Sequence, residues 1–137
     1  MNVETIHHVS IPVTDLERSR RFYREVLGLQ EIERPPFDFP GAWFAAGEGG
    51  HQVHLLVGEA PTFRDAKGVE SRDIHFALRV QSFRDAVELL ESKGYSEDAA
   101  ELDLLKLKVS PHSTAGFPQL YLLDPDRNII EINAGEL

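Results

Sequence analysis

Three histidines and one glutamate have the spacing of metal ligands supplied by two copies of one structural unit. His8 and His75 each begin one of two matching stretches, and His54 and Glu131 each end one of a second matching pair. Neutral imidazole and carboxylate groups are suitable ligands for Zn, Ni, Mn, Fe or Co. Two copies that each supply one ligand early and one late predict a four-ligand site between the halves of the chain.

The internal repeat is visible at two offsets. A shift of 67 positions places His8–Val13 on His75–Val80. A shift of 77 positions places Trp43–Leu55 on Leu120–Ile132, so that Trp43 falls on Leu120 and His54 on Glu131. The two shifts differ by ten, which indicates an insertion of ten residues in the second half. Repeats are sought before the fold is assigned, because a missed repeat gives the wrong fold.

The first half has the pattern βαβββ. Residues 5–13 alternate between apolar and polar side chains, as a strand does. Thr14 and Glu17 have capping-box spacing and predict a helix of about 13 residues that begins after Thr14 and ends at Gly28. Three further strands are expected at 29–34, 43–46 and 52–57.

The second half repeats the plan. A strand at 74–80 is followed by Ser82, which predicts the N-cap of a helix that ends at Gly94. Short strands are expected near 95–99 and 104–109, an inserted loop at 111–118, and a final hairpin at 119–123 and 129–133. We therefore expect one α+β domain over 1–137, built from two tandem βαβββ modules whose curved mixed sheets enclose a metal-containing cleft. Module one covers about 5–57, the linker about 58–72, and module two about 73–134.

The four candidate ligands share a strand face. Each of their strands has one apolar face that should pack on the helices: Val9/Ile11/Val13, Val53/Leu55/Val57, Ile74/Phe76/Leu78/Val80 and Ile130/Ile132. Side chains alternate strictly along a strand. His8, His54, His75 and Glu131 should therefore all lie on the face away from the helices.

Bulk composition narrows the class of protein. A formal net charge of −9 opposes binding to a nucleic-acid backbone, which needs a basic face. The absence of cysteine excludes disulfides and thiolate metal sites. We find no secretory signal and no apolar run of the roughly 20 residues that span a bilayer. A cytoplasmic protein is the expectation, without nucleic acid or membrane as partners.

The sequence resembles the vicinal oxygen chelate superfamily, which includes glyoxalase I, bleomycin-resistance proteins, fosfomycin-resistance enzymes and extradiol dioxygenases. The resemblance covers essentially the whole chain, and its most specific parts are His8–Gly28 and Asp124–Glu131. It implies paired modules around an open cleft, often across the interface of a homodimer, and a small-molecule substrate. It also implies a divalent metal ion held at the four positions His8, His54, His75 and Glu131.

Two residues depart from the family pattern. Glyoxalase I usually has Glu at the position of His54, so Glu131 is the preferred general base here. If His54 lies too far from the metal, then His8, His75 and Glu131 would form a two-His-one-carboxylate triad. Arg127 replaces a glycine of the family turn, and we expect Asn128 to take the left-handed conformation there.

The favoured function is that of a metal-dependent lyase or isomerase of the glyoxalase I type. It would act on a small hydroxycarbonyl or hemithioacetal by proton transfer through an enediolate, with Glu131 as the catalytic base. The enzymatic alternatives are an Fe(II) extradiol-type dioxygenase and a fosfomycin-type resistance transferase. The alternative of another class is a metal-free protein that sequesters a drug. A role for His112 in the inserted loop stays open.

Overall fold

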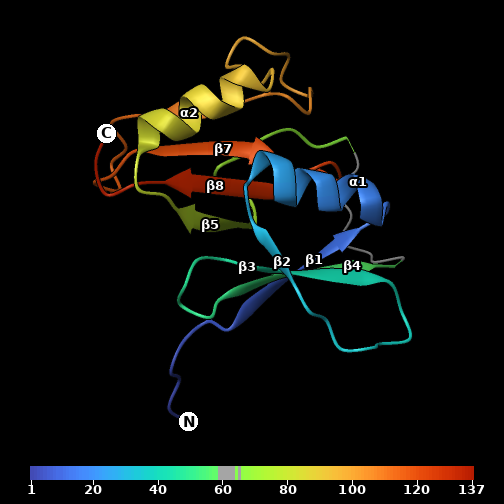
Figure 1. Cartoon of the computed structure of the whole chain (residues 1–137). Coiled ribbons are helices and arrows are strands. Elements are labelled where there is room, and N and C mark those ends of the chain that lie inside the picture. The colour runs from blue at the N-terminus through green and yellow to red at the C-terminus, as the bar shows by residue number, and fades with distance from the viewer. Residues whose placement is uncertain (59–63, 65) are drawn as a thin grey trace. The chain divides into compact units, whose positions relative to one another are not determined.

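Two compact units, Met1–Phe63 and Arg64–Leu137, make up the chain. The computed structural model describes residues 1–58, 64 and 66–137. Each unit holds one four-stranded mixed sheet, with strand orders β1-β4-β3-β2 and β5-β8-β7-β6 (Figure 1). The predicted α+β class and the two βαβββ modules are confirmed. Residues of the predicted linker from 59 to 63, and residue 65, lie outside the described part.

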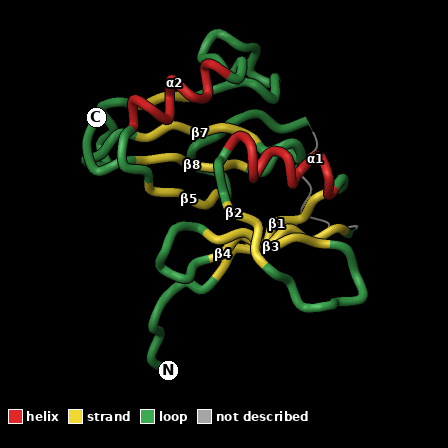
Figure 2. Tube along the Cα trace, in the orientation of Figure 1, coloured by secondary structure: helices red, strands yellow, loops and turns green. Residues whose placement is uncertain are grey.

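Module one carries a parallel pair at one edge of its sheet. Its elements are β1 (His8–Val13), α1 (Leu16–Arg21), η1 (Phe22–Val26), β2 (Gln30–Ile32), β3 (Gly41–Ala45) and β4 (Gln52–Val57) (Figure 2). Strands β1 and β4 run parallel, whereas β3 pairs antiparallel with both β4 and β2. The register places Ser10 and Trp43 on either side of His54.

Module two repeats this order. Its elements are β5 (His75–Arg79), α2 (Phe83–Ser92), β6 (Lys108–Ser110), β7 (Gln119–Leu123) and β8 (Ile129–Asn133). The strand predicted near 95–99 is wrong, because Ser96 forms only an isolated bridge with Lys106. The Ser96 hydroxyl accepts from the Asp98 amide and the Asp103 carboxylate from the Leu105 amide. Such local bonds hold the backbone in turns instead of a ladder.

The first helix begins one residue later than predicted. Asp15, not Thr14, is the N-cap: its backbone is extended and its carboxylate accepts from the Arg18 amide at 3.0 Å. The Thr14 hydroxyl instead accepts from the Arg18 side chain at 3.1 Å. Aspartate and threonine both cap helices well, so residue type alone does not decide between them.

The second turn of that helix widens into a π-helix, which the sequence did not reveal. The Leu27 amide donates to the Phe22 carbonyl and the Leu29 amide to the Tyr23 carbonyl, at 3.2 and 3.0 Å. Both aromatic residues are buried. The predicted stop at Gly28 is confirmed, with a φ of 69°.

The cap of the second helix is confirmed. The Ser82 hydroxyl accepts from the Asp85 amide at 3.2 Å, and the helix runs from Phe83 to Ser92. Gly94 then takes a φ of 91°, which fits the predicted end of the helix.

The hairpin register corrects the repeat at one point. Trp43 pairs with His54, and Tyr121 pairs with Glu131. Trp43 therefore corresponds to Tyr121, whereas the shift of 77 positions placed it on Leu120. The turn between β7 and β8 is one residue shorter than the turn between β3 and β4, which moves every position of β7 by one.

The turn after β7 also differs from the prediction. Arg127, not Asn128, has the positive φ, at 65°. Asn128 is fixed by the Asp124 carboxylate, which accepts from its amide and its side chain, both at 2.8 Å. The Arg127 guanidinium donates to the Lys67 and Leu102 carbonyls, at 2.9 and 3.0 Å. These bonds offset the roughly 1–2 kcal/mol that the left-handed conformation costs a residue with a Cβ.

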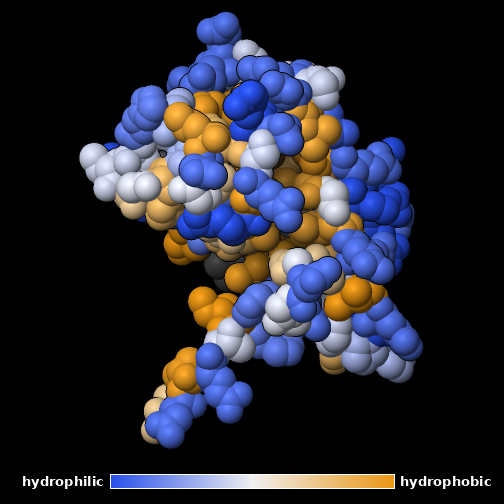
Figure 3. Space-filling view, turned by 60° about the vertical axis from the view of Figure 1, so that its left-hand side comes forward, coloured by the Kyte–Doolittle hydropathy of each residue, from blue (hydrophilic) through white to orange (hydrophobic). Residues whose placement is uncertain are grey.

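The predicted apolar strand faces are largely buried in β1, β4 and β8, but the face predicted at 74–80 is not: Ile74 is exposed, and Phe76, Leu78 and Val80 are half-buried. Fully buried side chains in module one include Val13, Phe44 and Leu55, and in module two Leu120, Leu122 and Ile130. Apolar groups also reach the surface of the N-terminal arm, seen at the lower left of Figure 3, where Met1, Val3 and Ile6 are exposed. Among the described residues, every helix is too short or too polar to cross a bilayer.

Candidate active site

His8 and His54 meet on the face of module one that lies away from the helix. His8 begins β1, His54 lies on the adjacent β4, and their rings stack with centroids 4.2 Å apart and an interplanar angle of 16°. Trp43, from β3, also stacks on His54, at 4.1 Å and 5°. His54 therefore lies in a stack of three rings contributed by three neighbouring strands.

The stack keeps His54 neutral. Burial, followed by the positive charges of His8, His7 and Arg34, lowers the pKa of His54 to about 4. Its Nε2–H donates to the Gln52 Oε1 at 2.7 Å, which leaves the lone pair on Nδ1. A neutral imidazole is the form that binds a metal ion, but its Nε2 is engaged by Gln52 in this arrangement.

Glu131 has a polar environment in module two. Its Oε1 accepts from the Asn133 Nδ2 at 2.6 Å and from the Gln119 Nε2 at 3.1 Å. Burial alone would raise the pKa of Glu131, but hydrogen bonds from Asn133, Tyr121 and Gln119, together with nearby His75, hold it below its ordinary value. The carboxylate is therefore buried and ionised at neutral pH.

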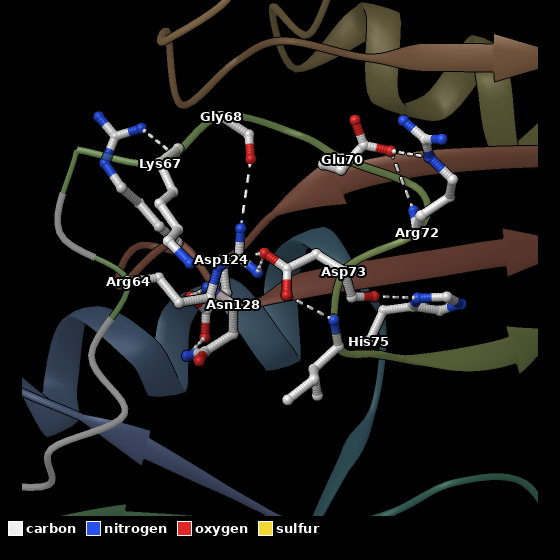
Figure 4. A network of polar contacts seen from close by, with 11 residues as sticks. Arg64, Lys67, Gly68, Glu70, Arg72, Asp73, His75, Asp124 and Asn128 are labelled. Atoms are coloured by element: carbon white, nitrogen blue, oxygen red, sulfur yellow. Dashed lines mark hydrogen bonds and ion pairs between the residues drawn. The ribbon is translucent and has the colours of Figure 1, made fainter.

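His75 is oriented toward this carboxylate. Its Nδ1–H donates to the Asp73 carbonyl at 2.8 Å, which leaves the lone pair on Nε2 (Figure 4). This Nε2 lies 3.3 Å from the Glu131 Oε2. Two ligand atoms at about 2.0–2.1 Å from one ion, at angles of 90–110°, lie about 3.0–3.4 Å apart. The two donor atoms thus have the separation of neighbouring metal ligands.

An ion pair holds the segment that orients His75. The Asp73 carboxylate lies 3.0 Å from the Arg64 Nη1 and 3.7 Å from the Lys67 Nζ, and it accepts from the Ile74 amide at 2.7 Å (Figure 4). The Ile74 amide and the charges of Arg64 and Lys67 lower the pKa of Asp73, against a smaller opposing effect of burial. Because Arg64 is itself buried, this contact fixes the chain just before β5.

The four predicted ligands are thus found as two pairs, His8 with His54 in module one and His75 with Glu131 in module two. The described residues contain no cluster of three or more metal-capable side chains. His112, in the loop after β6, is exposed.

Sequence reasoning named Trp43 and Tyr121 as possible lining residues but missed Gln119, Asn133 and Gln52. All five residues occupy the same strand faces as the candidate ligands. Burial and the hydrogen bond to Glu131 raise the pKa of Tyr121 to about 12, so its hydroxyl remains a donor. The alternation rule could have found them if it had been extended to the neighbouring strands.

Residues 5–132 match the Glyoxalase/Bleomycin resistance protein/Dioxygenase superfamily. The chain belongs to this superfamily, as the predicted resemblance to the vicinal oxygen chelate proteins implied.

Relatives in this superfamily differ in function. The chain is 30% identical to Glyoxylase I 4 of Arabidopsis thaliana over 96% of its own length and 71% of that protein. TnmS3, an antibiotic-binding protein from Streptomyces sp. CB03234, has a TM-score of 0.72 at 20% identity, with 98% of each chain covered. A fosfomycin resistance protein of Listeria monocytogenes, in complex with Mn(II) and 1S,2S-dihydroxypropylphosphonic acid, has a TM-score of 0.68 at 19% identity, covering 100% of this chain and 95% of that one. The structural likenesses establish the fold, and the reaction must be argued from the site.

Proposed function

We propose that this protein is a metal-dependent lyase or isomerase of the glyoxalase I type, which acts on a small hydroxycarbonyl or hemithioacetal. His8, His54, His75 and Glu131 would hold one divalent ion of Zn, Ni, Mn, Fe or Co. The observation that carries the proposal is the His75–Glu131 pair, whose donor atoms are 3.3 Å apart and individually oriented. Such orientation of ligands by surrounding groups is typical of metal sites.

A bound divalent metal would act as a Lewis acid that polarises substrate oxygens. The protein's own part in the reaction falls to Glu131. Its carboxylate is ionised, and its Oε1 is occupied by the Asn133 and Gln119 amides. As the one carboxylate among the four candidate ligands, Glu131 would take the substrate proton and return it.

A second function, with three ligands instead of four, has its own support. The Nε2 of His54 is bound to Gln52, and the ring is held between His8 and Trp43. Without His54, the set His8, His75 and Glu131 is the triad of Fe(II) oxygenases. An extradiol-type dioxygenase or a fosfomycin-type transferase would then replace the isomerase. A drug-binding protein without a metal is the remaining alternative, and TnmS3 is an antibiotic-binding protein of this fold.

Metal content is the first test. Untagged protein reconstituted separately with Ni, Zn, Mn and Fe(II) should retain about one ion per chain after gel filtration, by elemental analysis. His75→Ala and Glu131→Ala should lose the ion, whereas His112→Ala, which changes an exposed histidine, should retain it. No retained ion with any of the four metals would contradict all three enzymatic functions.

A substrate screen separates the enzymatic functions. Hemithioacetals, 2-hydroxyketones, catechols and epoxide antibiotics are offered to each metal form. Turnover of the first two classes supports the isomerase. Reaction of catechols alone, with Fe(II) and O₂ required, would replace it by the dioxygenase. Reaction of the epoxide alone, with a thiol consumed in equal amount, would replace it by the transferase.

The proposal includes a homodimer, in which each sheet edge and curved face is covered by a second copy. Light scattering at micromolar concentration tests it, and a monomer would refute it. If one chain completes the site of another, then mixing His8→Ala chains with Glu131→Ala chains should restore one intact site per mixed dimer. Each variant by itself should remain inactive.

A further inference from the structure

Two arginines rest on phenylalanine rings beside the ligand faces, one in each module. The guanidinium of Arg34 lies 4.7 Å from the Phe37 ring centroid and 4.8 Å from that of Phe39. The guanidinium of Arg79 lies 4.6 Å from the Phe117 ring centroid. Among the described residues neither arginine has a carboxylate partner, whereas Arg20, Arg24, Arg64 and Arg72 each form an ion pair.

Arg34 lies on the same face of module one as His54. Gly41 and Trp43 lie two residues apart on β3 and share a strand face. Trp43 pairs with His54, so a side chain at position 41 would point to the face that carries His54. A Cβ there would lie 3.1 Å from the Arg34 Nε and 3.2 Å from its Cζ. The guanidinium therefore fills the space left by the missing side chain of Gly41.

The donors of Arg34 are only partly satisfied. Its Nη2 donates to the Phe39 carbonyl at 2.9 Å, and its Nε is buried without a hydrogen-bond partner in the described structure. A guanidinium has five N–H donors and no acceptor, and its geometry matches a carboxylate or phosphate. Arg34 is thus held in place by rings and one carbonyl while retaining capacity for an anion.

Arg79 has the corresponding place in module two. His75, Ala77 and Arg79 are spaced two residues apart along β5, so they share one strand face. Ala77 pairs with Glu131, and Arg79 pairs with Asn133. Arg79 therefore lies on the strand face that carries His75 and Glu131, two residues further along β5 than the residue paired with Glu131. Its side chain is exposed, so an anion can reach it.

The corrected register shows that the two arginines rest on phenylalanines at equivalent positions of the two modules. Phe39 lies two residues before Gly41, the first residue of β3, and Phe117 lies two residues before Gln119, the first residue of β7. Gly41 pairs with Leu56, two residues after His54, and Gln119 pairs with Asn133, two residues after Glu131. Arg34 lies in the loop between β2 and β3, whereas Arg79 lies on β5. Each nevertheless rests on the phenylalanine at the same position of its module.

We propose that Arg34 and Arg79 bind anionic groups of the substrate, which is therefore a carboxylate- or phosphate-bearing molecule. This inference rests on the proposed function for the place of the reaction, and it adds the charge of the substrate. A protein of net charge −9 repels anions at long range, so recognition of an anion needs local cations. Arg34 and Arg79 supply them: each rests on an aromatic ring, lies on the strand face of the candidate ligands and has no acid partner among the described residues.

A matched pair of probes tests the proposal on the metal-reconstituted protein. Benzohydroxamate and 4-carboxybenzohydroxamate share a metal-binding group and differ in one carboxylate. Calorimetric titration should show about tenfold tighter binding of the carboxylated probe, as one charge-assisted contact gives. Arg34→Gln and Arg79→Gln should each reduce this preference, and the Lys variants should retain part of it. Arg84→Gln, on the exposed side of α2, is the matched control and should leave the preference unchanged.

A second measurement separates this inference from the proposed function. The arginine Nε–Hε resonances of ¹⁵N-labelled protein are followed during titration with benzoate in the presence of EDTA. Assignment comes from the Gln variants. Benzoate should shift the Arg34 and Arg79 signals more than that of Arg84, even if the protein holds no metal.

The outcomes are distinct. Equal affinity for the two hydroxamates together with no selective benzoate shift would overturn the proposal. Selective effects at one arginine would overturn the role of the other. Failure of metal binding with selective benzoate shifts would remove the proposed function and leave anion recognition supported.

Discussion

The two modules share one topology but place opposite chemical environments around the same ladder position. In module one this position is His54, which is stacked between His8 and Trp43 and has a pKa lowered to about 4. In module two it is Glu131, whose carboxylate accepts hydrogen bonds from two side-chain amides. The strand neighbour is Trp43 in one case and Tyr121 in the other. Symmetry of the backbone thus places the residues, and the neighbours on adjacent strands decide whether each is neutral or charged.

This difference gives the two pairs different roles in the proposed enzyme. Module one supplies His54, whose imidazole is neutral near neutral pH because its pKa is lowered to about 4. The network of module two supplies the one carboxylate among the four candidate ligands, with its position fixed by hydrogen bonds. Proton transfer should therefore depend on module two, and metal retention on both.

The largest expected effect comes from removing the carboxylate. Glu131→Gln keeps an oxygen that can coordinate weakly but cannot take a proton near neutral pH. Turnover should fall about 10²–10⁴-fold, as loss of a general base does, while metal binding weakens only in part. Steady-state kinetics on the substrate found by the screen, with elemental analysis of the same samples, provide the measurement.

His54→Gln is the matched change in module one. It should lower metal retention more than it lowers the rate per bound metal. Near-normal turnover of Glu131→Gln together with loss of turnover in His54→Gln would make His54 the base. The roles assigned to the two modules would then be reversed.

The next largest effect is a loss of stability in one module, which should be transmitted to the other if the modules unfold as one domain, as the sequence predicts. Leu122→Ala removes a fully buried side chain of module two and should cost about 2–5 kcal/mol of unfolding free energy. Trp43, the single tryptophan, reports on module one. Urea midpoints from Trp43 fluorescence and from far-ultraviolet circular dichroism should shift together. A shift in dichroism with an unchanged Trp43 transition would show that the modules unfold separately.

The fold was predictable because local signals agreed with the global plan. Alternation defined the strands, and Ser82 and Gly94 marked the second helix. Two of the errors lie where two residues compete for one role: Asp15 with Thr14 as the cap, and Arg127 with Asn128 for the left-handed conformation. For Arg127 the hydrogen bonds to the distant Lys67 and Leu102 carbonyls decide, and a sequence does not display such contacts.

The candidate site was predictable to the level of strand faces. Alternation placed all four candidate ligands on one face of their strands, and the structure brings His8 to His54 and His75 to Glu131. A single site made of all four stays a prediction. Of the missed amide partners, Gln52 and Asn133 lie two residues along the same strand from His54 and Glu131, and alternation could have found them. Gln119 was missed because its contact depends on cross-strand register. A turn shorter by one residue moved Tyr121, and not Leu120, next to Glu131.

A smaller effect concerns the pH dependence of the polar network. The Tyr121 hydroxyl is one of the groups that keep the pKa of Glu131 low, together with the Asn133 and Gln119 amides and against the opposing effect of burial. Tyr121→Phe should therefore raise the pKa of Glu131. Because the base acts when ionised, the acid limb of the kcat/KM profile should move toward neutral pH, with the plateau largely retained. Tyr95→Phe, elsewhere in module two, should leave the limb in place, and an unmoved limb in Tyr121→Phe would show that the hydroxyl does not bind the reacting carboxylate.

The smallest effect tests the stack of module one in metal-free protein. His54 has a pKa of about 4 when folded, against an ordinary value of 6.5. Between these values the unfolded chain binds a proton that the folded chain does not, so stability should fall as the pH is lowered from about 6.5 to about 4. His54→Phe keeps a ring between His8 and Trp43 but cannot be protonated, so its unfolding free energy at pH 7 should change little and depend less on pH below 6.5. Urea denaturation at pH 7, 6 and 5 in EDTA gives the comparison, with His112→Gln as the control at an exposed histidine. An unchanged pH slope in His54→Phe would mean that His54 titrates normally in the folded protein, and the contrast between a neutral His54 and an ionised Glu131 would then be lost.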